Sequence, residues 1–179
     1  MDMQLLVNLT SKAWSLKILA QLHAGLPGRQ APLIAATGAS RSSFSASLDH
    51  LFLLGLLERN PGHGHPLRPE FRLTETGKVA AGMASRIEEI VPDEDAFAVL
   101  RRSWTVPILA VTGSPSRFTA IKSGLGPVTD RALSKSLGVL EDQEWLRRDI
   151  DLSQRTPFPV YHAVNAGLQI NQAISAGVR

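Results

Sequence analysis

PVTDRALSKSLGVLEDQEWLRR, residues 127–148, is the stretch of sequence that decides the fold. Leu133, Leu137 and Leu140 recur at helical spacing, which predicts a short helix with one buried face. Trp145 and Leu146 then begin an extended segment, which predicts a strand directly after the helix. The opposite face of the helix carries small polar and basic side chains: Thr129, Arg131, Ser134 and Lys135.

A diverged copy of this pattern lies earlier in the chain. Trp14 and the pair Ile18–Leu19 recur 90 positions later as Trp104 and Ile108–Leu109. The other pairs, at an offset of 89 or 90, are Leu48 and Leu137, Leu51 and Leu140, Leu57 and Leu146, Arg59 and Arg148, Ser45 and Ser134, Ser47 and Ser136, Phe71 and Tyr161, and Gly77 and Gly167. Leucine matches arise in any two amphipathic helices, but tryptophan, arginine, aromatic and glycine positions that keep the same offset indicate an internal duplication.

The first copy predicts helices, then a hairpin, then a long helix. A helical repeat within residues 5–24 would be capped by Thr10 or Ser11 and ended by Gly25. A short helix over 33–37 would end at Gly38. The next helix would begin after a Ser40 cap, with an apolar stripe of Phe44, Leu48, Leu51 and Phe52 and an exposed serine face of Ser40, Ser42, Ser43, Ser45 and Ser47. The strands are expected around Leu57 and Phe71, and the long helix over 76–90 would bury Val79, Met83, Ile87 and Ile90.

The boundary between the two copies is predicted near Val91. Pro92 interrupts the helix, and the acidic run Asp93–Asp95 suits the start of the next one. We therefore expect one domain over residues 1–91 and a second over 92–179.

Composition limits the classes of function. The 179 residues contain 44% hydrophobic and 20% charged residues, which is typical of a globular chain. There is no cysteine, so disulfides, thiolate metal sites and thiol sensors are excluded. The N-terminal residues lack the features of a signal peptide and no run of about 18 apolar residues occurs, so we expect a cytoplasmic protein that does not contact a membrane. The net charge of +3 points weakly to nucleic acid, and the acidity concentrates in residues 70–101, with seven acidic against four basic side chains.

The second copy resembles the HxlR-type winged-helix regulators, relatives of the MarR group. The residues that carry this resemblance are Trp104, Ile108–Leu109, Arg117–Phe118, Arg131, Leu133–Ser134, Leu137, Leu140–Glu141, Leu146, Arg148, Pro159, Tyr161 and Gly167. The first copy is similar to the same family over fewer positions. The resemblance implies a mainly α fold with small β-hairpins (α+β), as two tandem winged helix-turn-helix domains arranged as a pseudo-dimer. It also implies a transcriptional regulator that binds double-stranded DNA, has no enzymatic activity and needs no cofactor.

Two features depart from that family. Its members normally carry one such domain and act as homodimers, whereas this chain would carry two, so that a homodimer of the whole chain is a further possible arrangement. Some members sense oxidants through a cysteine, which this chain lacks. The residues do not indicate any small-molecule effector.

The predicted DNA contacts come from two helices and two hairpin loops, the wings. Recognition helices need donors that reach base edges, together with hydroxyls and cations for phosphates. The wing of the second copy holds two carboxylates, Asp149 and Asp151, so its contacts are expected to be limited to its tip. The candidate residues are Ser40, Arg41, Ser42, Ser43, Ser45, Arg59, His63, His65 and Arg68 in the first copy, and Thr129, Arg131, Ser134, Lys135 and Arg155 in the second.

Other interpretations stay open for the same residues. Each exposed serine or arginine could simply be solvated surface. His63 and His65, two apart in a glycine-rich turn, lack the cysteine or clustered carboxylates that would complete a metal site, so a wing is favoured there. No catalytic motif is present. The alternative function is a tandem winged-helix protein that works mainly through protein contacts, as a chromosome-condensation accessory subunit or a replication-initiator module.

Overall fold

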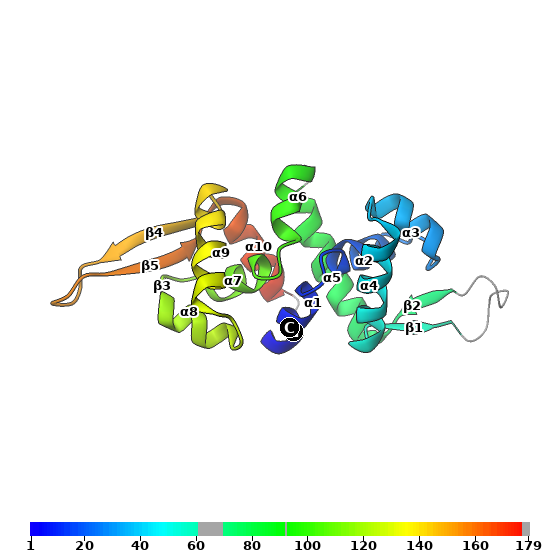
Figure 1. Ribbon diagram of the computed structural model, residues 1–179, viewed down its shortest axis with the longest axis horizontal. Coiled ribbons are helices and arrows are strands. Elements are labelled where there is room, and N and C mark those ends of the chain that lie inside the picture. Colours follow the sequence, from blue (N-terminus) through cyan, green and yellow to red (C-terminus); the bar gives the residue numbers. More distant parts are fainter. Residues whose placement is uncertain (61–69, 92, 177–179) are drawn as a thin grey trace.

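Ten helices and five short strands make up the part of the chain that the computed structural model describes, residues 1–60, 70–91 and 93–176 (Figure 1). The helices dominate, and the strands form one two-stranded and one three-stranded antiparallel sheet. The predicted α+β class, mainly α with small hairpins, is therefore confirmed. Among the described residues, no helix has both the length and the hydrophobicity that crossing a membrane requires.

The same order of elements occurs twice, except that the two-residue strand β3 of the second half has no counterpart in the described residues of the first. Residues 1–91, the first half, contain α1 (Met3–Thr10), α2 (Ser15–His23), α3 (Gln30–Thr37), α4 (Arg41–Leu53), β1 (Leu57–Arg59), β2 (Phe71–Leu73) and α5 (Glu75–Ile90). Residues 92–179, the second half, contain α6 (Glu94–Leu100), α7 (Thr105–Val111), β3 (Ser116–Arg117), α8 (Phe118–Leu125), α9 (Asp130–Asp142), β4 (Leu146–Asp151), β5 (Phe158–Ala163) and α10 (Asn165–Ser175). Helices α4 and α9 are both 13 residues long.

The repetition extends to backbone detail. After α4 the chain turns at Gly55 with a φ of 67°, and after α9 it turns at Glu144 with a φ of 58°. Gly77 packs against the backbone carbonyl of Leu56, and Gly167 packs in the same way against that of Trp145. Positions that match in the sequence therefore occupy matching places in the structure.

The core is continuous across the two halves. Buried side chains from both belong to one hydrophobic cluster, and α5 packs against α10 on one face of the molecule. The first helix of each half contacts the other half. Helix α1 packs on α7 and α8. Helix α6 is linked to α2 by an ion pair, in which Glu94 Oε1 of α6 lies 2.8 Å from Lys17 Nζ of α2. Arg101, just after α6, places its guanidinium 4.4 Å from the centre of the Trp14 ring.

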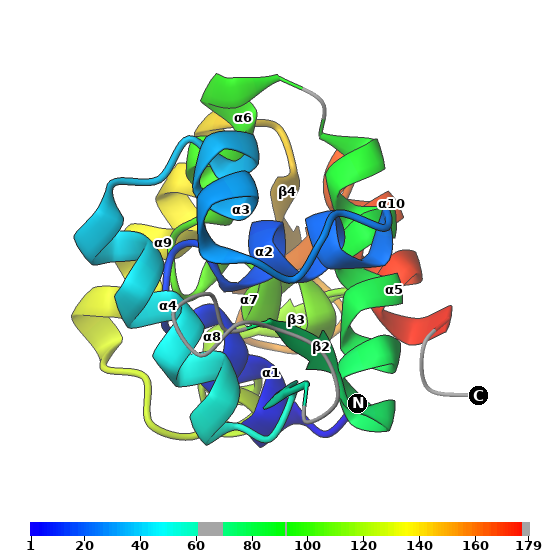
Figure 2. The same ribbon diagram turned by 90° about the vertical axis from the view of Figure 1, so that its right-hand side faces the viewer.

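Helices α4 and α9 lie on one face of the molecule, opposite α5 and α10. In Figure 1 both helices stand in front, with a hairpin at each end of the long axis. Turned by 90° in Figure 2, α4 and α9 fall on one side and α5 and α10 on the other. Both polar helix faces singled out from the sequence therefore belong to elements on the same side.

The predicted cap of the first long helix is wrong. The helix breaks after Thr10 and resumes at Ser15, with Trp14 as an N-cap that makes no side-chain hydrogen bond. The Thr10 hydroxyl donates to its own helix and lies 2.9 Å from the carbonyl oxygen of Ser103, while Ser11 Oγ donates to Asn8 O at 2.7 Å. Both hydroxyls thus serve the end of α1 and not the start of α2.

Two predicted helix faces need smaller corrections. Ser47 is 2% exposed, because it accepts a hydrogen bond from the backbone N–H of Trp14 at 3.3 Å. Val79 is 50% exposed, since the buried stripe of α5 runs through Ala80, Met83 and Ile87. Helix α3 begins at Gln30, earlier than expected. The ends at Gly38 and Gly55, and the caps at Ser40 and Asp93, are confirmed.

Candidate nucleic-acid interface

Helix α9 is held so that its polar face points outward. The Thr129 hydroxyl oxygen accepts a hydrogen bond from the Ala132 N–H at 3.2 Å and caps the helix. Leu133, Leu137 and Leu140 are buried, as their spacing predicted. The face opposite them is exposed and carries Arg131, Ser134 and Lys135.

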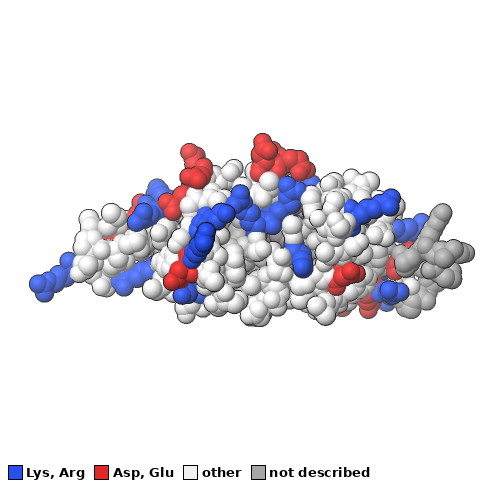
Figure 3. All heavy atoms as spheres, in the orientation of Figure 1, with Lys and Arg blue, Asp and Glu red and all other residues white. Residues whose placement is uncertain are grey.

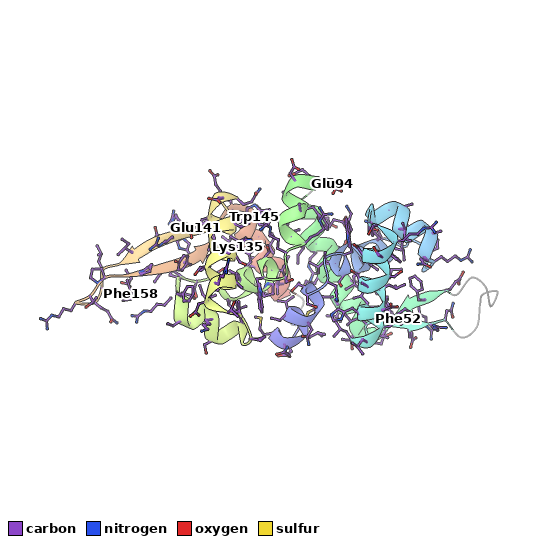
Figure 4. All side chains as sticks on the ribbon, in the orientation of Figure 1. Phe52, Glu94, Lys135, Glu141, Trp145 and Phe158 are labelled. Atoms are coloured by element: carbon purple, nitrogen blue, oxygen red, sulfur yellow. The ribbon has the colours of Figure 1, made fainter. Side chains whose placement is uncertain are left out.

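The cations on this face are not neutralised by neighbours. Arg131 and Lys135 are one helical turn apart, and neither has an ion-pair partner within residues 1–60, 70–91 and 93–176. Asp130, the acidic residue beside them, is paired with Lys122 of α8 at 2.6 Å. Figure 4 shows Lys135 on α9, with Glu141 and Trp145 near the end of that helix. The outward face of α9 therefore offers long, unpaired donors.

Helix α4 presents shorter side chains. Its Ser40 cap accepts from the Ser43 N–H at 3.3 Å, and the Ser40 hydroxyl also lies 3.3 Å from that of Ser42 and 3.0 Å from that of Ser43. Ser45 is half-buried, with its Oγ 3.5 Å from the Gln30 amide nitrogen. The serines are thus partly engaged with one another, which leaves less of their hydrogen-bonding capacity for a ligand.

Two predicted arginines of the first half meet at a groove. It lies between α3, α4 and the β1–β2 hairpin, encloses about 1140 Å³, and is lined by Arg41 and Arg59 among others. Neither arginine has an ion-pair partner in the described part of the chain, whereas Arg29 on the rim pairs with Glu70. The groove therefore brings two free guanidinium groups to one surface beside α4.

The β4–β5 hairpin extends away from the body of the molecule (Figure 1). Its carboxylates are engaged: Asp149 Oδ2 lies 3.2 Å from Arg147 Nε and 3.4 Å from His162 Nδ1. The Asp151 carboxylate accepts the Ser153 N–H at 2.8 Å, and hydrogen bonding to Ser153 lowers the pKa of Asp151. Arg155, in the turn, is exposed and unpaired among the described residues. The predicted candidates His63, His65 and Arg68 lie outside the residues that the structure describes.

The sequence prediction missed exposed basic residues in the loops before α2 and α7. Figure 3 shows Lys and Arg side chains gathered over α9 and in the centre beside α6, with acidic side chains at the top of the view. Lys12 lies between α1 and α2, and Arg102 lies between α6 and α7; both are exposed. They stand 90 positions apart, two residues before Trp14 and Trp104, so the offset of the duplication would have revealed them.

A further missed residue supports the second hairpin. The Arg117 guanidinium lies 3.4 Å from the centre of the Phe158 ring, at the edge of the three-stranded sheet. Such a contact stabilises an exposed pair by roughly 0.5–1 kcal/mol. Arg117 was noted in the sequence only as part of the family pattern, and its contact with Phe158 depends on the pairing of β3 with β5.

Metal ligands do not gather in the described residues: no group of three or more His, Cys, Asp or Glu side chains is placed to hold an ion. His50 Nε2 lies 2.7 Å from the backbone oxygen of Asn8 and serves the packing of α4 on α1. Comparisons with protein-family models, with curated proteins and with solved structures found no match.

Proposed function

We propose that the protein is a sequence-specific transcriptional regulator that binds double-stranded DNA. In this proposal residues 1–91 and 92–179 are two winged helix-turn-helix domains arranged as a pseudo-dimer. Helices α4 and α9 are the recognition helices, and the β1–β2 and β4–β5 hairpins are the wings. The observation that carries the proposal is the placement of α4 and α9 on one face, with a hairpin at each end (Figures 1 and 2).

This placement suits the geometry of a DNA duplex. Dimeric helix-turn-helix proteins read two half-sites about 34 Å apart, one helical turn, because both recognition helices then enter the major groove on the same side. A single chain with two such helices would do this without a second copy. Because α4 and α9 carry different side chains, the preferred site would be an imperfect palindrome.

The charges on the same surfaces favour a polyanion. Arg131 and Lys135 on α9, and Arg41 on α4, are exposed and unpaired within the described part of the chain. Lys12 and Arg102, in the loops before α2 and α7, add two exposed cations. Cations of this kind bind phosphates and release counterions, which makes the affinity fall steeply with salt. The proposed activity is binding alone, with no enzymatic step and no cofactor.

The test is a pair of measurements on the whole chain. We expect affinity for mixed genomic DNA at low salt that falls as salt rises, with a log–log slope of about −0.9 for each phosphate contacted. Arg131→Ala should weaken binding to the preferred sequence about 10-fold, with little effect on random duplex, because a side chain that contacts a base edge discriminates by roughly 1–3 kcal/mol. Gln169→Ala, an exposed position on α10 at the opposite side of the molecule, serves as the control and should change neither affinity. Absence of any DNA affinity at low salt would exclude this function.

A second candidate function has one specific observation in its favour. Ile150 and Leu152, on the β4–β5 hairpin, are 64% and 75% exposed. Exposed apolar side chains on an extended arm suit a protein partner. In the alternative, the protein acts mainly through protein contacts, as an accessory subunit in chromosome condensation or a replication-initiator module. This alternative would be favoured if the chain bound a protein partner, and if that binding were insensitive to salt and lost in Leu152→Ser.

A further inference from the structure

We infer that the two halves of the bound DNA site are unequal: α9 specifies bases, whereas α4 holds its half-site with little base preference. This inference rests on the proposed function. It assigns which part of the chain sets the sequence preference and by what chemistry. It follows from a comparison of α4 and α9 position by position.

The two helices can be aligned without ambiguity. Each is 13 residues long and is capped by a hydroxyl side chain, Ser40 or Thr129, on the residue before it. Each is also followed, two positions after its last residue, by a residue with positive φ, Gly55 after α4 and Glu144 after α9. The buried residues correspond as well, Phe44, Leu48 and Leu51 in α4 against Leu133, Leu137 and Leu140 in α9. The outward positions therefore pair as Arg41 with Asp130, Ser42 with Arg131, Ser45 with Ser134, Ala46 with Lys135, and Asp49 with Gly138.

The paired side chains differ in reach. Arg131 and Lys135 can donate to the O6 and N7 of guanine in the major groove, the commonest base-specific contact. At the same positions α4 has Ser42, whose hydroxyl lies 3.3 Å from that of Ser40, and Ala46, which offers only a methyl group. Neither of these can donate two hydrogen bonds to one base.

Beyond the first turn, where α4 has Arg41 and α9 has Asp130, the charges differ in the same sense. Asp49 on α4 is exposed, with no ion-pair partner in the described residues, whereas the corresponding position on α9 is glycine. An unpaired carboxylate on this face disfavours close approach to phosphates. On α9 the only acidic residue of the first turn, Asp130, is held by Lys122 at 2.6 Å. Helix α9 is therefore suited to enter a groove more deeply than α4.

Helix α4 still has groups that bind the DNA backbone. Arg41 and Arg59 line the groove beside it, which Asp49 also lines, and both arginines are exposed. Contacts of this kind fix the position of a protein on the duplex and carry no sequence information. The first half would thus add affinity to any sequence, while the second half selects.

Binding-site selection from a random duplex library, at one fixed salt concentration, tests the inference. The intact chain should enrich one block of strongly preferred base pairs. A second block, about one helical turn away, should show weak preference. Arg131→Ala should flatten the strong block at one or two base pairs, each by about 10-fold in preference. Ser42→Ala changes the same position in the other half and tests the inference directly: whatever its effect on affinity, it should leave the selected sequence unchanged.

The outcomes separate the inference from the function on which it rests. A selected site with two equally strong half-sites would overturn the inference while DNA binding stands. A motif that changes in Ser42→Ala but not in Arg131→Ala would also overturn it. Failure of the intact chain to enrich or bind any duplex would overturn the proposed function as well. Both substituted side chains are exposed, and unchanged circular dichroism would show that the variants fold.

Discussion

At the scale of single residues, three glycines differ in how much space surrounds them. Gly167 packs so closely against the backbone carbonyl of Trp145 that a Cβ would overlap it, and Gly77 does the same against Leu56. Gly138, in the interior of α9, has no atom within 4 Å of the place where a Cβ would stand. The first two glycines are required by packing, whereas the third only weakens its helix.

We therefore expect opposite effects from one kind of substitution. Gly167→Ala should destabilise the protein by about 1–3 kcal/mol, because the backbone on both sides must shift. Gly138→Ala should stabilise it by about 0.5–1 kcal/mol, since alanine is the better helix former and the space is open. Urea unfolding of the two variants would measure both values. Equal effects of the same sign would contradict the packing described for Gly167.

The turns that follow α4 and α9 allow a second comparison. Glu144 adopts a φ of 58°, where its counterpart Gly55 has 67°. This conformation is roughly 1–2 kcal/mol less favourable for a residue with a Cβ. Part of that cost is offset because the Asn165 side chain donates to the Glu144 carbonyl oxygen at 3.0 Å.

Glu144→Gly should therefore raise stability by up to about 1 kcal/mol, while Gly55→Ala should lower it by about 1 kcal/mol. Thermal unfolding of the two single variants would check the signs. A loss of stability in Glu144→Gly would show that the glutamate side chain contributes more than its backbone costs.

At the scale of elements, α9 could be predicted from the sequence almost completely and α2 could not. Three leucines at helical spacing and the strand after Trp145 are local signals, and both agree with the structure. Thr129, which was expected on the polar face, instead caps the helix. At the break after Thr10, the Thr10 hydroxyl bonds both to Leu6 O of its own helix and to Ser103 O, which is 93 positions away in the chain. The contact with Ser103 leaves no local trace in the sequence.

The residues of the candidate site likewise divide into those that local sequence signals predicted and those that they did not. Arg131 and Lys135 were predicted because they face away from the buried leucines. Ser47 was misplaced, because a serine next to an apolar stripe can equally turn inward when a backbone N–H, here that of Trp14, needs an acceptor. Lys12 and Arg102 went unnoticed because each stands outside a periodic segment.

The attachment of α6 to α2 should depend on pH. The hydrogen bond and charge of Lys17 lower the pKa of Glu94, so the ionised form is favoured in the folded state. A carboxyl whose pKa is lowered by folding adds stability above its ordinary pKa, and this stability is lost as the pH falls through the lowered value. Burial has the opposite effect on neighbouring Glu88, since it raises the pKa of that group and favours its neutral form.

We expect Glu94→Gln to lower stability at pH 7 by no more than about 0.5 kcal/mol, because the Glu94 side chain is 72% exposed. The difference from the unsubstituted chain should vanish in acid, below the lowered pKa that Glu94 has in the folded state. Glu88→Gln should instead raise stability slightly at pH 7 and have less effect in acid. Urea unfolding at several pH values would check the two profiles, and parallel profiles would contradict the roles assigned to these carboxyls.

At the scale of the whole molecule, the two halves share one interior. Helix α1 buries Leu6 and Leu9 and packs on α7 and α8 of the second half. Helix α6 reaches back toward α2, and the Arg86 guanidinium on α5 donates to the carbonyl oxygen of Ala173 on α10 at 3.1 Å. Separating residues 1–91 from 92–179 would expose apolar surface on both sides, which costs about 25 cal/mol for each Å². This mutual burial also fixes the distance between α4 and α9.

We therefore expect the chain to unfold in one cooperative transition. Calorimetric and van't Hoff enthalpies should agree, and Gly167→Ala, in the second half, should shift the unfolding of the first half equally. Hydrogen exchange of amides in α2 would report the first half, and that of amides in α9 the second. Arg131→Ala, an exposed change, should leave both unaltered. If exchange in α2 kept its original protection in Gly167→Ala, the halves would be energetically independent, and the spacing of α4 and α9 would then not be set by the shared core.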